Sequence, residues 1–445
     1  MRLHSPRESY LWLKALWDHR RTQRLSRTQL EAEQRAKFRR LVSFIYQHSP
    51  YYRALIKTHG LDPLTCLPTD FPILTKSDVI EHFNEIITDR TITRRDIAEF
   101  LSRSRDPEEL FRGRYHVLHT SGTSGTVGYY LFSHKAWIKG ASNPIRVSSL
   151  RLRRKVAYIA ATRGHFAGVS LVLAGNDGTN RLFHNVRTFD VGQPLSQIIR
   201  ELNQFQPEAI SGYATILRQL AEAQERGELR ISPTHIGNGG EALLPEVKAY
   251  LERVFRVPAL NSYASSEHLV MGLNLPGTDG LHLLEDDLIF ELRPDCTCIT
   301  NLFNEVLPLI RYRMDDVLIP DTSNHSPYPY TKVQEVIGRR EHSLAFTNEH
   351  GQEDFIHPIV IVELIIPGLK AWQVVLESKT RFRFRACFNS NLTKQEHQET
   401  QKHLCAKLDA ILAEKEMRNV AFTLEPVDSL PIDAATGKFR LVLRA

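Results

Sequence analysis

Short apolar segments alternate with longer amphipathic segments between about residues 113 and 320, and this alternation limits the possible folds more than any other feature. Residues 155–161 and 171–175 have the length and apolar character of buried strands. In residues 195–205 and 243–255 the apolar side chains recur at helical spacing, which predicts helices that cover a sheet. Strands and helices that alternate in this way are typical of an α/β fold.

A separate small unit is predicted after the irregular, proline-containing run 320–330. Residues 381–388 alternate strictly between apolar and mostly arginine side chains, which predicts a strand with one buried face. The Thr-x-x-Glu pattern of residues 393–396 is a capping box that opens a helix, and residues 419–427 are again strand-like.

The N-terminal region is rich in arginine and helical in pattern. Tyr10, Leu13, Leu16 and Trp17 recur at helical spacing, which predicts an amphipathic helix. A basic amphipathic helix can lie on a membrane, but the pattern favours packing of this stripe against the rest of the protein.

Composition and charge exclude several classes of protein. The chain is 42% hydrophobic and 24% charged, so it is neither collagen-like nor wholly disordered. The difference between 57 basic and 51 acidic residues is +6, which is too dilute over 445 residues to indicate a nucleic-acid partner. A nucleic-acid-binding module would also leave the motifs below unexplained.

The five cysteines favour free thiols in a reducing compartment, because their number is odd and no Cys-x-x-Cys spacing occurs. Cys296 and Cys298, separated by one residue, lack the spacing of zinc ligands, so no structural zinc is predicted. No export signal or membrane-spanning run is visible. We therefore expect a cytoplasmic protein without a membrane partner.

A loop of Thr, Ser and Gly follows a short apolar strand in the run HVLHTSGTSGTVG, residues 116–128. Glycine lets the backbone approach a ligand, and backbone N–H groups and hydroxyls can donate to phosphate oxygens. The loop is a candidate phosphate site, although it matches neither the P-loop nor GxGxxG. Taken alone, it is equally well interpreted as a surface turn.

Four further segments carry residue types of a catalytic site. They are GNGGEAL (237–243), NSYASSEHL (261–269), LPLIRYRMDDV (307–317) and PIDAATGKFRLVLRA (431–445). Each segment alone is weak evidence for a catalytic site. The order and spacing of these four segments and the Thr/Ser/Gly loop, taken together, are specific.

In that order and spacing the sequence resembles the adenylate-forming superfamily of acyl- and aryl-coenzyme A ligases. TSGTSG is similar to its phosphate loop, YASSE to its Tyr-Gly-x-x-Glu turn, and RYRMDD to its Tyr-Arg-x-x-Asp segment. VIGRREH resembles its hinge region, and TGKFR its C-terminal Gly-Lys. Residues 49–79, GLHLLEDD and PLIRYR further resemble the phenylacetate-coenzyme A ligase branch, and the match runs from about residue 49 to the C-terminus.

The resemblance implies a nucleotide site. The loop would hold the β- and γ-phosphates of ATP, Tyr263 would stack on the adenine, Ser266 would approach the α-phosphate, and Asp316 would accept from the ribose hydroxyls. The implied ATP- and AMP-binding residues are Thr120, Ser121, Gly122, Thr123, Ser124, Gly125, Gly240, Glu241, Tyr263, Ala264, Ser265, Ser266, Asp316 and Arg339.

Two catalytic residues are implied in addition: Glu267, which would bind Mg²⁺, and Lys438, which would bridge the α-phosphate and the substrate carboxylate. A carboxylate that attacks a phosphate brings two anions together, so the site needs a metal and a mobile cation. His342 takes the hinge position, where a surface histidine is the favoured interpretation over a pH-sensitive pivot. His165 lies where the acyl pocket of the superfamily begins, although a loop histidine is more often solvated.

The implied fold is α/β. A large N-terminal domain (residues 1–338), with mixed sheets covered by helices, binds ATP and acid, and a small mobile α+β C-terminal domain (residues 339–445) carries Lys438. The implied activity is ATP-dependent adenylation of an aryl or acyl carboxylic acid with release of pyrophosphate, then transfer to coenzyme A.

Other functions stay open. The acyl group could instead pass to an amine or to a carrier-protein thiol. A nucleotide sensor is disfavoured because both Glu267 and Lys438 are present. A homodimer is left open, and the sequence does not name the acid.

Overall fold

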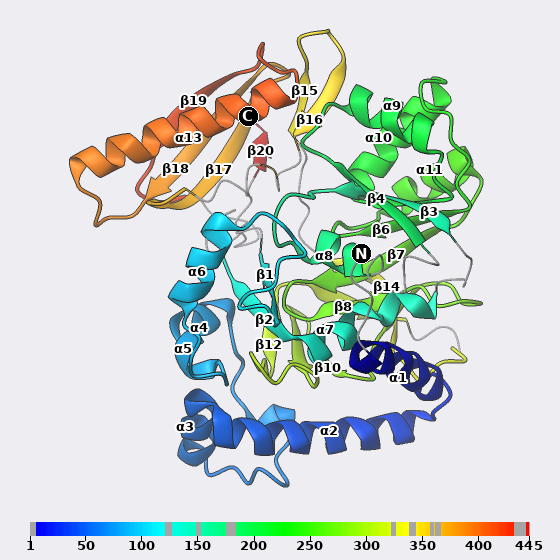
Figure 1. Cartoon of the computed structure of the whole chain (residues 1–445), viewed down its shortest axis with the longest axis vertical. Coiled ribbons are helices and arrows are strands. Elements are labelled where there is room, and N and C mark those ends of the chain that lie inside the picture. The colour runs from blue at the N-terminus through cyan, green and yellow to red at the C-terminus, as the bar shows by residue number, and fades with distance from the viewer. Residues whose placement is uncertain are drawn as a thin grey trace.

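The protein is described here from a computed structural model (Figure 1). Helices from the N-terminal part lie along one end of the molecule, a large sheet occupies the middle, and the C-terminal strands and helix lie at the other end. The described residues are 6–120, 127–147, 153–174, 184–321, 326–337, 344–356, 360, 366–430 and 442–444.

The N-terminal part is helical, as its pattern predicts. The Ser26 side chain accepts from the backbone N–H of Gln29, and the Gln29 side chain accepts from the backbone N–H of Ser26, which together form a capping box. Thr93 and Asp96 form a second capping box. The helices are α1 (Pro6–Thr22), α2 (Arg27–His48), α3 (Pro50–Thr58), α4 (Lys76–Glu81), α5 (Phe83–Ile86) and α6 (Arg94–Arg103), with a 3-10 turn at Pro68–Asp70.

The predicted packing of the apolar stripe of α1 is wrong for Tyr10, Leu13 and Trp17, whereas Leu16 is half-buried. Tyr10, Leu13 and Trp17 are 61%, 66% and 62% exposed. The buried face of α1 instead carries His19 and Thr22. These polar side chains turn inward because a buried ion pair in the core offers them hydrogen-bond partners.

A nine-stranded mixed sheet has the order β13-β14-β9-β8-β7-β6-β5-β3-β4. Strands β4, β3, β5, β6 and β7 are parallel to one another, and β8, β9, β14 and β13 continue the sheet with antiparallel pairs. The strands are β3 (Arg154–Ala160), β4 (His184–Asp190), β5 (Ala209–Gly212), β6 (His235–Gly239), β7 (Ala259–Ser265), β8 (Leu269–Leu273), β9 (Leu281–Leu283), β13 (Val317–Pro320) and β14 (Lys332–Ile337).

Helices α9 (Leu195–Phe205), α10 (Ala214–Glu225) and α11 (Pro245–Phe255) pack on the parallel strands and share a core with them. The predicted helices at 195–205 and 243–255 are therefore confirmed. The predicted strand at 171–175 is wrong, because this segment belongs to α8 (Ala167–Ala174). Its residues are apolar on all sides, and a short run of that kind does not distinguish a buried strand from a buried helix.

Two smaller antiparallel sheets share a core with the N-terminal helices. Strands β1 (Tyr115–His119) and β2 (Tyr129–Ser133) form one, and β10 (Leu288–Leu292), β11 (Thr297–Asn301) and β12 (Tyr312–Met314) form the other. Helix α7 (His134–Ala141) and the 3-10 turn Asn143–Arg146 follow β2. The α/β class and the mixed sheets covered by helices are as predicted.

The C-terminal part has a core of its own, in which Phe346, Phe384 and Leu408 are buried. The predicted strand at 381–388 and the predicted capping box at Thr393 are confirmed. The boundary after residue 338 and the mobility of this part stay predictions. The elements are β15 (Leu344–Thr347), β16 (Glu353–Ile356), β17 (Leu369–Ser378), β18 (Arg381–Phe388), α13 (Lys394–Glu414), β19 (Ala421–Pro426) and β20 (Val442–Arg444), with β19-β18-β17-β20 forming one sheet.

Within the described ranges, no helix is both long enough and apolar enough to cross a membrane. All five cysteines are free, and Cys66, Cys296, Cys298 and Cys387 are buried.

Candidate active site

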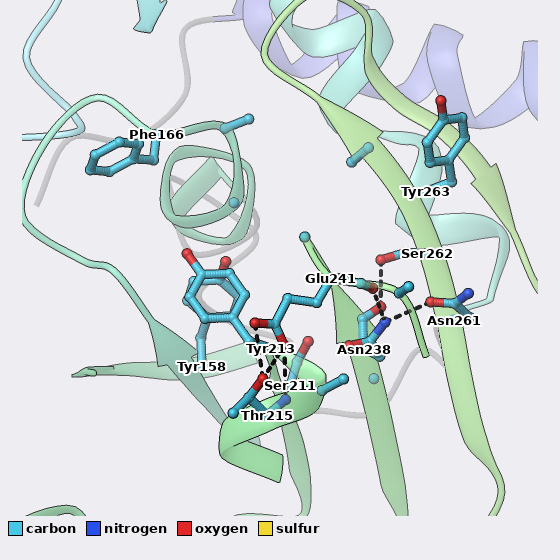
Figure 2. Close-up of a pocket in the computed structure, with 18 of the residues that line it drawn as sticks. Tyr158, Phe166, Ser211, Tyr213, Thr215, Asn238, Glu241, Asn261, Ser262 and Tyr263 are labelled. Carbon is cyan, nitrogen blue, oxygen red and sulfur yellow. Dashed lines mark hydrogen bonds between the residues drawn. The ribbon is translucent and has the colours of Figure 1, made fainter. Parts of the chain in front are cut away.

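One cavity of about 1920 Å³ brings together residues from four of the five sequence segments. Its lining includes Ser211, Gly239 and Ser265 near the carboxyl ends of β5, β6 and β7, and the carboxyl ends of parallel strands commonly form ligand sites. Figure 2 shows Tyr158, Phe166 and Tyr213 on one side of the space and Tyr263 on the other. The predicted site residues that line it are Thr120, Gly240, Glu241, Tyr263, Ala264, Ser265, Ser266, Glu267 and Asp316.

The glycine turn after β6 approaches the cavity closely. Gly240 has a φ of +86°, and a Cβ added there would lie 2.9 Å from the ring of Tyr213. Buried Asn238 donates to the carbonyl of Glu241 at 2.7 Å and to Asn261 Oδ1 at 2.7 Å. The turn is therefore fixed between β7 and the start of α10, and only glycine fits at position 240.

Glu241 itself holds the turn against α10. Its carboxylate accepts from the backbone N–H of Thr215 at 2.8 Å and from the Thr215 hydroxyl at 2.8 Å (Figure 2). A carboxylate at the first turn of a helix is stabilised by the helix dipole. This role was not predicted, because α10 is distant from residue 241 in the sequence.

Tyr263 and Asp316, the predicted adenine and ribose contacts, are hydrogen-bonded. The Tyr263 hydroxyl, on β7, donates to Asp316 Oδ2 at 2.8 Å. Asp316 lies between β12 and β13, so the bond connects the two segments. A carboxylate has about four acceptor positions, so Asp316 can accept from Tyr263 and from a ribose together.

Glu267 is buried at the cavity wall and is linked to a pair of tyrosines. The Tyr312 hydroxyl donates to Glu267 Oε1 at 3.4 Å, and it lies 2.9 Å from the Tyr130 hydroxyl. Burial, reinforced by the Glu267 charge, raises the pKa of Tyr130 well above its ordinary value. The raised pKa keeps the Tyr130 phenol neutral at neutral pH, so its hydroxyl can share a hydrogen bond with that of Tyr312.

The base of the Thr/Ser/Gly loop is closed by two hydrogen bonds between Thr120 and Gly128. Gly128 N–H donates to Thr120 Oγ1 at 2.9 Å, and Thr120 N–H donates to the Gly128 carbonyl at 3.0 Å. A Cβ at Gly128 would lie 2.8 Å from the Tyr130 hydroxyl. Ser266 Oγ, in turn, donates to the carbonyl of His119 at 3.1 Å. The loop base and the YASSE turn are thus packed together.

Two histidines beside the loop are buried. The ring of His119 packs on Phe166 with 4.5 Å between centroids, and burial lowers its pKa to about 4. His165 is 1% exposed, and its Nε2 lies 2.9 Å from Ser104 Oγ. The interpretation of His165 as a solvated loop residue is wrong, because Ser104, distant in sequence, supplies a buried hydrogen-bond partner.

Several predicted residues lie outside the described residues. They are Ser121, Gly122, Thr123, Ser124, Gly125, Arg339, His342 and Lys438.

The described residues fit a nucleotide-bound Mg²⁺. Mg²⁺ at such sites is held by one or two carboxylates plus phosphate oxygens, and Glu267 is a buried carboxylate at the cavity wall. In the described part of the chain, no group of three or more His, Cys, Asp and Glu residues is arranged to hold a metal ion. A metal bound there would be held by Glu267 together with phosphate oxygens of the nucleotide.

Sequence reasoning missed the site residues Tyr130, Tyr213, Thr215, Asn238 and Tyr312. Asn238 and Tyr312 lie inside quoted motifs, so their positions were a signal. Nothing local marks Tyr130 or Thr215, which reach the site through the folding of β2 and α10.

No family model matches the sequence. Protein CapK of Staphylococcus aureus is 23% identical over 344 residues, which cover 69% of this chain and 67% of that protein. Phenylacetate-coenzyme A ligase of Thermus thermophilus is 26% identical over 328 residues, which cover 66% of each chain. The alignments thus span about two thirds of the length of these relatives.

Solved structures with the same fold include 2-hydroxyisobutyryl-CoA ligase. Its complex with 2-HIB-AMP and CoA matches with a TM-score of 0.62 and 17% identity, covering 96% of this chain and 91% of that one. Its postadenylation state with R3-HIB-AMP matches with a TM-score of 0.59 and the same identity and coverage. The predicted resemblance is confirmed: the chain has the fold of the adenylate-forming ligases and is similar in sequence to phenylacetate-coenzyme A ligases.

Proposed function

We propose that the protein is an AMP-forming acid–thiol ligase. It adenylates an aryl or acyl carboxylic acid with ATP and then transfers the acyl group to coenzyme A. The observation that carries this proposal is the single cavity shared by Thr120, the glycine turn, the YASSE turn and Asp316. The relatives named as phenylacetate-coenzyme A ligases support it.

In the first half-reaction a carboxylate oxygen attacks the α-phosphorus of ATP, and the bond to the pyrophosphate oxygen breaks. Thr120 and residues 121–125 hold the phosphates, Tyr263 stacks on the adenine and Asp316 accepts from the ribose. Glu267 would hold Mg²⁺, which would neutralise charge on the phosphates. Lys438 bridges the substrate carboxylate and the α-phosphate and neutralises negative charge on their oxygens.

In the second half-reaction the thiol sulfur of coenzyme A attacks the acyl carbon and the bond from that carbon to the phosphate oxygen breaks. AMP leaves, and the thiol proton passes to solvent. We propose that residues 339–445 rotate about His342 between the two steps, while residues 1–338 keep the adenylate. The cavity also has apolar lining from Phe166, Leu171 and Val172, which suits an aryl or acyl chain. Free cysteines suit a cytoplasmic location. A homodimer remains a proposal.

An acid-dependent ATP–pyrophosphate exchange screen over aryl and fatty acids tests the adenylation step. We expect exchange that requires both Mg²⁺ and one class of acid. ATP binding by calorimetry without exchange for any acid would indicate a nucleotide sensor instead.

A second candidate acceptor is an amine or a carrier-protein thiol. Coenzyme A carries three phosphates, so its binding site needs cationic side chains. Two arginines of β18 already form ion pairs with carboxylates of this chain. Arg383 pairs with Glu377, and Arg385 pairs with Glu425 at 3.1 Å. Mass spectrometry of complete reactions with coenzyme A or amines decides between the acceptors. A hydroxylamine-trapped adenylate without acyl-coenzyme A would exclude the thiol ligase.

A further inference from the structure

Helix α1 buries His19 and Thr22 beside Ala15 and the partly buried Trp12, whereas three of its large apolar side chains are exposed. Thr22 Oγ1 donates to buried Asp286 Oδ2 at 2.7 Å, and His19 Nε2 lies 2.8 Å from Ser142 Oγ. The inner face is thus held by polar bonds. The outer face carries Tyr10, Leu13 and Trp17, here termed the outer stripe, and each of them is more than 60% exposed.

The outer stripe is narrow and lies between cations. At about 100° per residue, its three side chains span roughly 60° of the helix. Exposed Arg7 and Lys14 lie along one border, and exposed Arg20 lies along the other. Each border of the stripe is therefore positively charged.

The acidic residues of α1 do not cancel this charge at the outer face. Glu8 pairs with His134 at 3.1 Å, and Asp18 pairs with Lys139 at 3.3 Å, both on α7. Both carboxylates are mostly buried, whereas Lys14, which also reaches Asp18, is half exposed. The carboxylates thus help to hold α1 on α7 and leave a cationic border outside.

Helices α1 and α2 carry an excess of positive charge. Residues 6–48, which include both helices, contain ten Lys and Arg residues and four Asp and Glu residues, a net charge of +6. In Figure 1, α1 and α2 lie together at one end of the molecule, so an anionic partner would be attracted to that end.

We propose that the outer stripe of α1 docks the protein on an anionic lipid bilayer. Trp and Tyr favour the headgroup region, and a helix with Trp, Leu and flanking Lys and Arg lies in the plane of the interface. The stripe has only three apolar side chains, whereas a stable protein interface buries about 800 Å² on each partner. Charge complementarity and the small apolar area both favour lipid over a protein partner.

The test is co-sedimentation of the full chain with vesicles of phosphatidylcholine alone or with 30% phosphatidylglycerol, at about 50 mM and 500 mM salt. We expect at least tenfold tighter binding to the anionic vesicles at low salt, and its loss at high salt. The variant Tyr10→Ser/Leu13→Ser/Trp17→Ser and the variant Arg7→Gln/Lys14→Gln/Arg20→Gln should each weaken binding at least tenfold. The assay needs no enzymatic turnover, so it is independent of the proposed activity.

Matched controls exist elsewhere on the chain. Leu64→Ser/Leu67→Ser removes apolar side chains that are 65% and 49% exposed, and Lys394→Gln/Lys402→Gln/Lys407→Gln removes the same charge from exposed positions of α13. Both controls should bind as the unchanged protein does. Equal binding to neutral and anionic vesicles, no binding to either, or full binding by the serine variant would overturn the proposal. A dimer in solution that the serine variant abolishes would assign the stripe to a second copy and would also overturn it.

Discussion

The hydroxyl oxygens of Tyr130 and Tyr312 lie 2.9 Å apart, and Tyr312 also donates to Glu267. The pair joins β2, which follows the Thr/Ser/Gly loop, to β12, which precedes Asp316. Three segments of the proposed nucleotide site therefore depend on one buried contact.

Tyr312→Phe should weaken the binding of Mg²⁺ at Glu267. It removes the donor that orients the carboxylate and leaves the buried Tyr130 hydroxyl with one partner fewer, a loss of about 1–3 kcal/mol. We expect a several-fold higher Mg²⁺ requirement in pyrophosphate exchange and weaker Mg–ATP binding by calorimetry. Tyr328→Phe, whose hydroxyl bonds the Pro276 carbonyl at an exposed position, is the control. An unchanged Mg²⁺ dependence in Tyr312→Phe would refute the positioning role.

Asp316→Ala should weaken ATP binding with little effect on folding. A hydrogen bond to a charged acceptor contributes about 1.5–3 kcal/mol, which is roughly 10- to 150-fold in Kd. Calorimetric titration with ATP measures the loss, and Asp295→Ala, at a 62% exposed carboxylate, is the control. Normal ATP binding, or simple unfolding of the variant, would mean that the ribose assignment is wrong.

Lys438→Ala should separate the two half-reactions. Loss of one preorganised donor to the transition state costs about 2.7–4 kcal/mol, so adenylation should fall by a factor on the order of 10² to 10³. Conversion of a supplied acyl-adenylate to thioester should stay near normal, because residues 339–445 are proposed to rotate between the steps. Lys394→Ala is the control. Equal loss in both half-reactions, or in neither, contradicts the role of Lys438.

Acid should destabilise the fold partly through His282. This residue on β9 is fully buried, its Nε2 lies 2.9 Å from Ser326 Oγ, and burial lowers its pKa to about 4. Because the unfolded chain binds this proton near pH 6.5, the stabilisation is present above that pH and is lost as pH falls toward 4. At pH 4.5 the protonation of His282 lowers the free energy of unfolding by about 2 kcal/mol.

Urea denaturation at pH 7 and pH 4.5 measures this effect. The difference in the free energy of unfolding should be smaller by about 2 kcal/mol in His282→Gln than in the unchanged protein. The exposed His350→Gln should behave as the unchanged protein does. The same pH dependence in both variants would exclude His282 as the source.

Lys415 should hold the C-terminal part against the large sheet. Its buried ammonium lies 3.1 Å from Asp354 Oδ1 and donates to the carbonyls of Val191 and Gln193 at 3.4 Å and 2.8 Å. Removal of one partner from a buried pair costs about 3–5 kcal/mol. We expect a loss of that size in Lys415→Met by urea denaturation, with earlier proteolysis of residues 366–430.

The exposed pair Lys379–Glu353 provides the contrast, since such pairs contribute about 0–1 kcal/mol. Lys379→Met should therefore change the free energy of unfolding little. Equal effects of Lys379→Met and Lys415→Met would show that burial of the Lys415 pair has no special role.

The sequence alone determined the α/β class, the helices at 195–205 and 243–255, the strand at 381–388 and its capped helix. These features depend on local periodicity and on side chains that bond within a few residues, so a linear pattern contains them. The order of the five motifs likewise indicated which segments form one site, and the cavity contains residues from four of them.

The tertiary structure decided what depends on distant partners. It turned the 171–175 run into a helix, buried His165 against Ser104, and used Glu241 to cap α10. It also left the stripe of α1 exposed, because Asp286 offered His19 and Thr22 better partners than solvent. Helical spacing shows that one face is apolar, but which face is buried depends on the polar groups that the rest of the chain brings to it.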